Sequence, residues 1–146
     1  MIKPLIALGI ALSPVAVASA EEFAATNTYV TETKTWPTGE KDGYWMVKFT
    51  GVSQIAKGPI ETMAVECNGA GFWSAEGIVG TGICVHGSGE DTFVLRFDNK
   101  PGSNTWRILS GTGKYIGLTG SGTATTKKLP GNRRVSVLNG DVNLAN

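Results

Sequence analysis

The sequence is poor in the residues that most catalytic and metal sites need. It has one histidine, two cysteines and 17% charged residues, and its formal net charge is +1. One histidine cannot build a multi-histidine catalytic zinc site, and balanced charge creates no field that draws a chain to nucleic acid or an anionic membrane. No metal, cofactor or nucleic-acid partner is therefore expected.

Helical periodicity and long apolar runs are also lacking. No stretch of eleven or more residues repeats apolar side chains at the helical period, so no helix longer than two turns is expected. Glycine is abundant instead, at 20 of 146 residues, with four tryptophans, three tyrosines and five phenylalanines. This composition favours an all-β domain with a packed interior over a helical or disordered chain.

The first twenty residues have the form of a secretory signal peptide. Lys3 is followed by an apolar run from Leu5 to Leu12 and by small residues that end at Ala20. The run is shorter than the roughly 20 residues that span a bilayer, and no later segment is longer, so no transmembrane segment is expected. We predict a signal peptide at 1–20, cleaved after Ala20, and a β-barrel domain at 21–146 in a secreted or periplasmic protein.

Export would allow Cys67 and Cys84 to form a disulfide, because two cysteines in an oxidising compartment have only one intramolecular pairing. The alternative is a redox or metal-binding pair. A separation of 17 residues does not match Cys-x-x-Cys, so the structural disulfide is the preferred interpretation.

After a polar start from Glu21 to Thr28, short alternating segments separated by turn signals such as Asn68-Gly69 and Pro130-Gly131 run through the chain, as is typical of an antiparallel barrel. We predict strands at Tyr29–Trp36, Tyr44–Thr50, Ile60–Cys67, Phe72–Glu76, Ile78–His86, Thr92–Phe97, Thr105–Leu109, Tyr115–Thr126 and Arg134–Leu144. Eight or nine such strands suffice to close one small barrel. The predicted fold is a single closed antiparallel barrel of about eight strands.

Alternation also predicts the faces of the strands. Trp45, Val47 and Phe49 share one face, and Phe93, Leu95 and Phe97 share another, which we assign to the interior. A disulfide would turn Gly80 and Gly82 inward with Cys84. Glycine at alternate positions lets a strand coil sharply or admits a bulky neighbour from across the core.

The segment from Ile108 to Thr126 is the most distinctive motif. It resembles the glycine-rich hairpin of the allene oxide cyclase and dirigent barrel superfamily, and a similar pattern occurs in small exported bacterial proteins of undefined function. The matching residues are Gly111, Thr112, Gly113, Lys114, Tyr115 and Gly117, then Gly120, Ser121, Gly122 and Thr123. The resemblance implies an eight-stranded barrel that binds or converts hydrophobic small molecules, often as a homo-oligomer. It supplies no catalytic residue.

Two kinds of site are not expected from the sequence, namely a nucleotide-binding P-loop and a catalytic Ser-His-Asp triad. The Gly111-x-Gly113-Lys114 sequence lacks P-loop spacing and is followed by no helix. His86, Ser88 and Asp91 fall within six positions of one expected glycine-flanked turn, a poor arrangement for a Ser-His-Asp triad.

Aromatic side chains are the best candidates for a ligand site. The predicted ligand-binding residues are Trp45, Phe49, Trp73, His86, Phe93, Trp106 and Tyr115. The alternative is that the four tryptophans simply fill the barrel. Glu66, Glu76 and Arg96 are candidate polar groups at the site or its rim, although alternation turns Glu66 outward. Lys127, Lys128, Arg133 and Arg134 flank the Pro130-Gly131 turn and form a basic rim that could steer an anionic head group.

Three functions remain open at this point. The first is a barrel that binds a hydrophobic or amphipathic small molecule, and no reaction is assigned to it. The second is an isomerase or cyclase that uses one carboxylate or tyrosine in an apolar cavity. The third is an envelope or interaction protein with a solid core and an exposed apolar patch.

Overall fold

The computed structural model describes residues 19–144. All but the last two residues of the expected signal peptide lie outside this range. The elements are β1 (Glu21–Pro37), β2 (Gly43–Lys57), β3 (Met63–Ser74), β4 (Gly77–Ser88), β5 (Asp91–Lys100), β6 (Ser103–Gly111), the 3-10 turn η1 (Gly113–Tyr115), β7 (Thr119–Leu129) and β8 (Arg133–Asn143).

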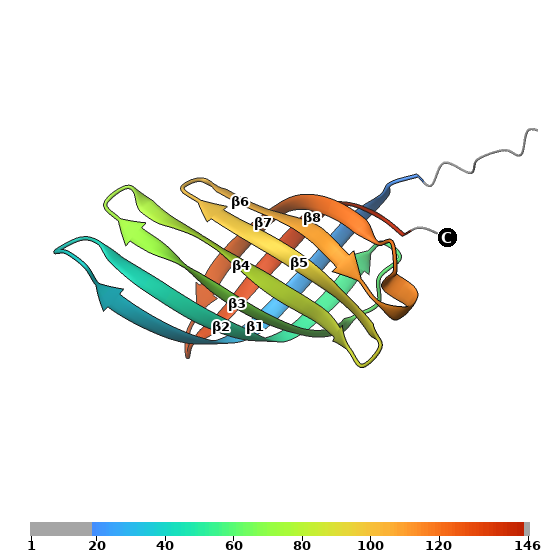
Figure 1. Cartoon of the computed structure of the whole chain (residues 1–146), viewed down its shortest axis with the longest axis horizontal. Helices are drawn as coiled ribbons and strands as arrows, with labels where there is room; N and C mark the ends of the chain where they lie inside the picture. Colours follow the sequence, from blue (N-terminus) through green and yellow to red (C-terminus); the bar gives the residue numbers. More distant parts are fainter. Residues whose placement is uncertain (1–18, 145–146) are drawn as a thin grey trace, which may run out of the picture.

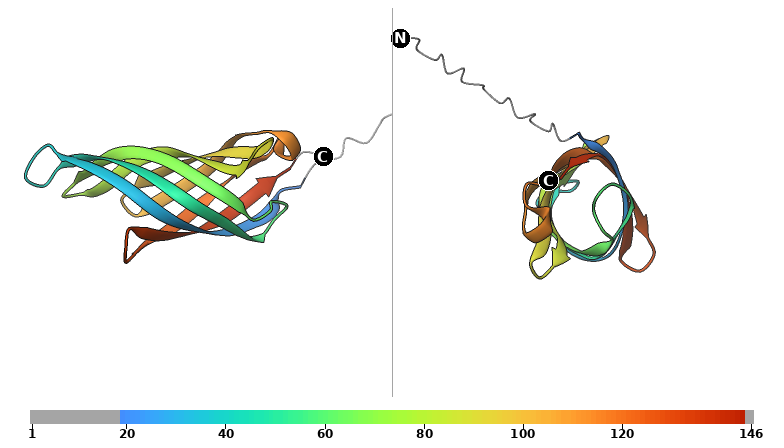
Figure 2. Two further views of the ribbon diagram at one scale, coloured as in Figure 1. Left: turned by 90° about the horizontal axis from the view of Figure 1, so that it is seen from below. Right: turned by 90° about the vertical axis from the view of Figure 1, so that its right-hand side faces the viewer.

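The eight strands form one closed barrel. Each strand pairs antiparallel with the next in sequence, and β1 pairs with β8 to complete the ring, as the end-on view in Figure 2 shows. This confirms the predicted all-β fold. Closure leaves no free sheet edge, which is one way in which β proteins avoid edge-to-edge aggregation.

Because every connection joins adjacent strands, the turns alternate between the two ends of the barrel (Figure 1). The β1–β2, β3–β4, β5–β6 and β7–β8 turns lie at one end, which we call the mouth. The other three connections, the start of β1 and the end of β8 lie at the opposite end, which we call the floor.

Burial follows the predicted alternation. Trp45 and Val47 of β2 and Phe93 and Leu95 of β5 are buried, and the residues between them are more exposed. Cys67 and Cys84 lie directly opposite each other on β3 and β4 and form a disulfide, as predicted. These inward side chains form the barrel interior.

Inward glycines provide space for inward aromatic rings. A Cβ atom at Gly80 would lie 2.3 Å from Cζ2 of Trp45, and one at Gly82 would lie 2.3 Å from Cζ of Phe97. On β7, a Cβ atom at Gly122 would lie 2.7 Å from Cζ2 of Trp106. The alternate glycines therefore admit bulky neighbours, as the sequence pattern indicates.

The predicted strands 60–67 and 72–76 were wrong as separate elements. They form one strand, β3, that begins at Met63, and Ile60 is buried in the connection before it. Asn68-Gly69 makes no turn. Gly69 instead lies against the Phe97 ring, where a Cβ atom would come within 2.6 Å of Cζ.

Three further expectations need correction. The polar start of the domain is part of β1, whose inward positions include the buried polar residue Asn27. Tyr115 lies in η1 and not in a strand. The expected turn at His86, Ser88 and Asp91 is shorter than predicted, because β4 continues to Ser88. His86 lies within β4, in agreement with the predicted strand Ile78–His86, and its side chain is buried in the barrel.

Candidate functional site

The barrel contains a cavity of about 650 Å³ in its mouth-side half. Residues from all eight strands line it, together with Pro101 of the β5–β6 turn. A cavity of this size lies in the range of about 300–1,000 Å³ that is usual for small-molecule sites. The barrel is therefore hollow and not filled by its tryptophans.

One wall of the cavity is apolar. It includes Trp45, Val47 and Phe49 of β2, the Cys67–Cys84 disulfide, and Leu95 and Phe97 of β5. Phe49 and Phe97 meet edge to face, with ring centroids 6.2 Å apart. Trp106 also lines the cavity and is fixed by a 3.0 Å hydrogen bond from its Nε1 to the Thr123 carbonyl.

The opposite wall carries a polar group formed by β1, β7 and β8. Asn27 Nδ2 donates a 2.6 Å hydrogen bond to the Tyr29 hydroxyl, and the Thr126 and Ser136 hydroxyls are 2.7 Å apart. Burial raises the pKa of Tyr29 to about 12, although the bond from Asn27 acts in the opposite direction. Tyr29 therefore stays neutral and can donate its own hydrogen near neutral pH.

Two buried polar atoms in this lining are unpartnered within residues 19–144. They are Oδ1 of Asn27 and Nε1 of Trp45, one an acceptor and the other a donor. Buried polar atoms normally have hydrogen-bond partners, so these two are exceptions in the lining of the cavity.

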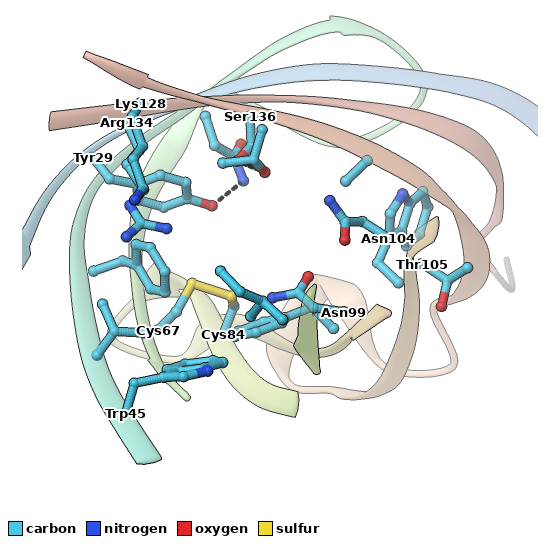
Figure 3. A pocket seen from close by; sticks show the side chains of 18 of the residues that line it. Tyr29, Trp45, Cys67, Cys84, Asn99, Asn104, Thr105, Lys128, Arg134 and Ser136 are labelled. Carbon is cyan, nitrogen blue, oxygen red and sulfur yellow. Dashed lines mark hydrogen bonds between the residues drawn. A yellow bond between two sulfur atoms is a disulfide. The ribbon is translucent and has the colours of Figure 1, made fainter. Parts of the chain in front are cut away.

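Arg134 is the charged side chain set deepest in the polar wall. It is half-buried beside Tyr29, its cross-strand neighbour on β1, and its guanidinium lies 5.5 Å from the centroid of the Phe49 ring. Desolvation lowers the pKa of Arg134 below its usual value. Figure 3 shows Arg134, Tyr29 and Lys128 together on one side of the cavity.

The floor of the barrel is closed by the glycine-rich motif. Thr112 donates to the Glu90 carbonyl through its hydroxyl (2.7 Å), and the Lys114 amide donates to the Asp91 carboxylate (3.0 Å). Gly113 has a φ of 54° and contacts residues 90 and 91 so closely that a Cβ atom would lie 2.0 Å from Oδ1 of Asp91. The motif thus holds the 112–118 connection against the β4–β5 turn.

Tyr115 is the plug that this connection carries into the barrel. Its side chain is 1% exposed and packs edge to face on Phe93, which in turn stacks on His86 with ring centroids 4.5 Å apart. These packed rings therefore fill the floor end of the barrel.

Comparison with solved structures shows which known fold this barrel shares. The chain aligns with the pterocarpan synthase dirigent protein GePTS1 over 94% of its own length and 98% of that chain, with a TM-score of 0.51 and 13% sequence identity. The fold is the dirigent fold. No family model and no curated protein matches the sequence.

Within this dirigent-fold barrel, the seven predicted ligand-binding residues fall into two groups. Trp45, Phe49, Trp73 and Trp106 line the cavity. His86, Phe93 and Tyr115 are buried in the floor and are not part of the lining. A direct contact between a ligand and any of the seven stays a prediction.

Sequence reasoning found only part of the polar wall. Lys128 and Arg134 were named as part of a basic rim beside the Pro130-Gly131 turn and do line the cavity, whereas Lys127 and Arg133 do not. Asn27 fell in a segment interpreted as a polar start, and Tyr29 was not singled out as an inward residue. The available signal was the period of two, because Phe23, Ala25, Asn27 and Tyr29 alternate along one strand.

The polar candidates named from the sequence lie elsewhere. Glu66 points outward, as predicted, and pairs with Lys48 at 3.2 Å. Arg96 pairs with Asp98 on the same outer face of β5 at 2.8 Å, and Glu76 lies in the β3–β4 turn. None of the three lines the cavity.

The outer face of β1–β4 near the mouth carries an aromatic row. Trp36 contacts Tyr44 at a centroid distance of 5.7 Å, and Tyr44 contacts Phe72 at 5.3 Å. Trp36 and Phe72 are about half exposed. An exposed apolar patch is the feature that the interaction-protein alternative requires, and assembly into homo-oligomers stays a prediction.

Residues 19–144 contain neither a metal-binding cluster nor a helix that could cross a membrane. This part of the chain has no group of three or more His, Cys, Asp or Glu side chains arranged to hold a metal ion. It also has no helix of the length and apolar character that crossing a bilayer needs.

Proposed function

We propose that this protein binds an apolar or amphipathic small molecule in the cavity of its barrel, as an exported protein. The observation that carries the proposal is the cavity itself, which has an aromatic wall and a few polar groups opposite it. Apolar walls with a few placed polar groups are characteristic of small-molecule sites. The disulfide fits an oxidising compartment, and the predicted signal peptide would deliver the chain there.

An isomerase or cyclase is the less favoured alternative. No carboxylate is among the cavity-lining residues, and Tyr29 is held neutral by its raised pKa. A neutral phenol can donate a hydrogen bond, but it is a poor general base near neutral pH. The dirigent protein of similar fold is named a synthase, and 13% identity gives no residue-by-residue basis for assigning that activity to this chain.

The first test is mass spectrometry of an organic extract from the folded, oxidised protein purified from its native envelope. A near-stoichiometric apolar species would support the proposal and identify the ligand. If nothing co-purifies and the neutral dye N-phenyl-1-naphthylamine gives no saturable fluorescence change, the binding function is overturned.

Paired tryptophan variants then locate the site. Trp45→Ala should weaken binding of the neutral dye about tenfold, because it removes an aromatic wall of the cavity. Trp36→Ala removes an indole from the outer face and should leave binding within about twofold of the wild type. If Trp45→Ala fails to fold, Trp73→Ala tests the same wall at a half-buried position near the mouth. Equal binding by all variants would contradict a site in the cavity.

A further inference from the structure

The charges that line the cavity all have one sign. Lys100, Lys128 and Arg134 are among the lining residues, and no aspartate or glutamate is. The whole chain, by contrast, has 13 basic and 12 acidic side chains. The cavity is therefore positively biased in a nearly neutral protein, and charges in a low-dielectric recess act more strongly than the same charges in water.

Arg134 is the basic group best placed to recognise a ligand. The ion pairs of residues 19–144 are Lys48–Glu66, Lys57–Glu22, Arg96–Asp98 and Lys114–Glu61, so Arg134 has no acidic partner in this part of the chain. A half-buried guanidinium without an anion loses hydration, which the contact with the face of the Phe49 ring replaces only in part. Its planar fork binds carboxylate-like groups through two parallel hydrogen bonds.

Neighbouring side chains extend this site. Tyr29 on β1 and Lys128 on β7 are the cross-strand neighbours of Arg134 on β8. The Tyr29 hydroxyl accepts its hydrogen bond from Asn27, so its own hydrogen can be donated to a bound oxygen. The three side chains therefore offer a guanidinium, an ammonium and a phenol on one side of the cavity (Figure 3).

The apolar wall determines the rest of the ligand. Phe49 lies under the guanidinium, and Trp45, Leu95 and Phe97 continue the apolar lining beyond it. We propose that the ligand is an anionic amphipath that places its acid group on Arg134, Tyr29 and Lys128 and its apolar body along the β2 and β5 wall. This inference depends on the proposed binding function and narrows it to one class of ligand.

Two dyes with nearly the same aromatic body test the proposal. 1-Anilinonaphthalene-8-sulfonate is anionic, and N-phenyl-1-naphthylamine is its neutral counterpart. The oxidised wild-type protein should bind the sulfonate at least about tenfold more tightly, as expected for a charge-assisted contact. Arg134→Gln should remove most of that preference and leave the affinity for the neutral dye within about twofold.

Lys127→Gln is the matched control. It removes one positive charge from the same hairpin at an exposed position that does not line the cavity, and it should change neither affinity. If the neutral dye binds and the sulfonate is not preferred, or if Lys127→Gln acts like Arg134→Gln, the anionic ligand is overturned and the binding function stands. If neither dye binds, the binding function itself fails.

Discussion

A single buried histidine shows how one residue connects the stability of the barrel to pH. His86 is 1% exposed, stacks on Phe93 with an interplanar angle of 6°, and has no partner for Nδ1 within residues 19–144. Burial lowers its pKa to about 3. The folded protein therefore holds this imidazole neutral over a pH range in which a solvated histidine takes up a proton.

Acid should destabilise the wild type through this residue. The unfolded chain protonates His86 near its ordinary pKa of about 6.5, so stability is lost progressively as the pH falls from there toward 3. Between pH 6 and pH 4 the loss should be about 2 to 3 kcal/mol greater than in His86→Phe, which keeps a ring against Phe93. Urea denaturation of both proteins across this range measures the difference. Parallel pH profiles would contradict the buried neutral imidazole.

The 112–118 connection shows how an element produces the shape of the site. Its glycines are needed where the backbone turns and where it approaches the β4–β5 turn, and its tyrosine fills the floor. This part of the most distinctive sequence motif therefore closes the barrel and contributes no residue to the cavity wall, whereas Ala124 and Thr126 at the end of the motif line the cavity. That explains why the resemblance predicts the architecture better than the ligand.

Loss of Asp91 should loosen this connection. Asp91→Ala removes the acceptor of the Lys114 amide, and a lost hydrogen bond to a charged group costs about 1.5 to 3 kcal/mol. Amide hydrogens of residues 112–118 should then exchange with solvent about tenfold faster or more, as measured by NMR or mass spectrometry. Asp42→Ala, in the β1–β2 turn at the mouth, should leave this exchange unchanged. Unaltered exchange in Asp91→Ala would show that the contact does not hold the floor.

The strands show how far the sequence alone could predict the elements. Where apolar and polar residues alternate, as in Trp45–Phe49 and Phe93–Phe97, both the strand and its inward face were predicted correctly. Where a polar residue faces the interior, as Asn27 does, apolar and polar residues no longer alternate, and the first part of β1 was therefore not predicted as a strand. Asn68-Gly69 was interpreted as a turn because this dipeptide is a common turn signal. Gly69 instead lies within β3, where it leaves space for the ring of Phe97 on β5.

The aromatic part of the candidate site could be predicted from the sequence, whereas its lower boundary and most of its polar wall could not. Aromatic residues of the wall are evident from composition and alternation, and four of the seven predicted positions line the cavity. The boundary between the cavity and the floor depends on the side chains that two of the three floor connections, β2–β3 and β6–β7, place in the barrel. No local sequence pattern encodes which side chains these are. The polar wall depends on the pairing of β1 with β8, which lie at opposite ends of the barrel sequence.

At the scale of the whole molecule, the disulfide links neighbouring strands of the barrel and also forms part of its cavity wall. It closes a loop of about 18 residues, for which the chain-entropy model gives about 3 kcal/mol of stabilisation. The hydrogen-bonded β3–β4 pairing continues on both sides of it, from Val65 to Ser74. Loss of the disulfide should therefore lower the free energy of unfolding, while the barrel fold itself should still form.

Cys67→Ala/Cys84→Ala should lower the free energy of unfolding by about 3 kcal/mol and keep the β-rich circular dichroism spectrum. Reduction of the wild-type protein should produce a similar loss in urea denaturation. A variant as stable as the oxidised wild type would contradict the stabilising role, and a variant without β structure would show that the bond is required for the fold.

The pairing of β1 with β8 determines where the barrel can be attached to a surface or to another protein. Glu21 lies opposite Val142 at the floor, so the barrel begins and ends side by side, on the far end from the mouth. A tether, fusion partner or sensor surface joined at either point leaves the mouth facing outward. The protein can be immobilised through one strand end without obstructing the mouth of the barrel.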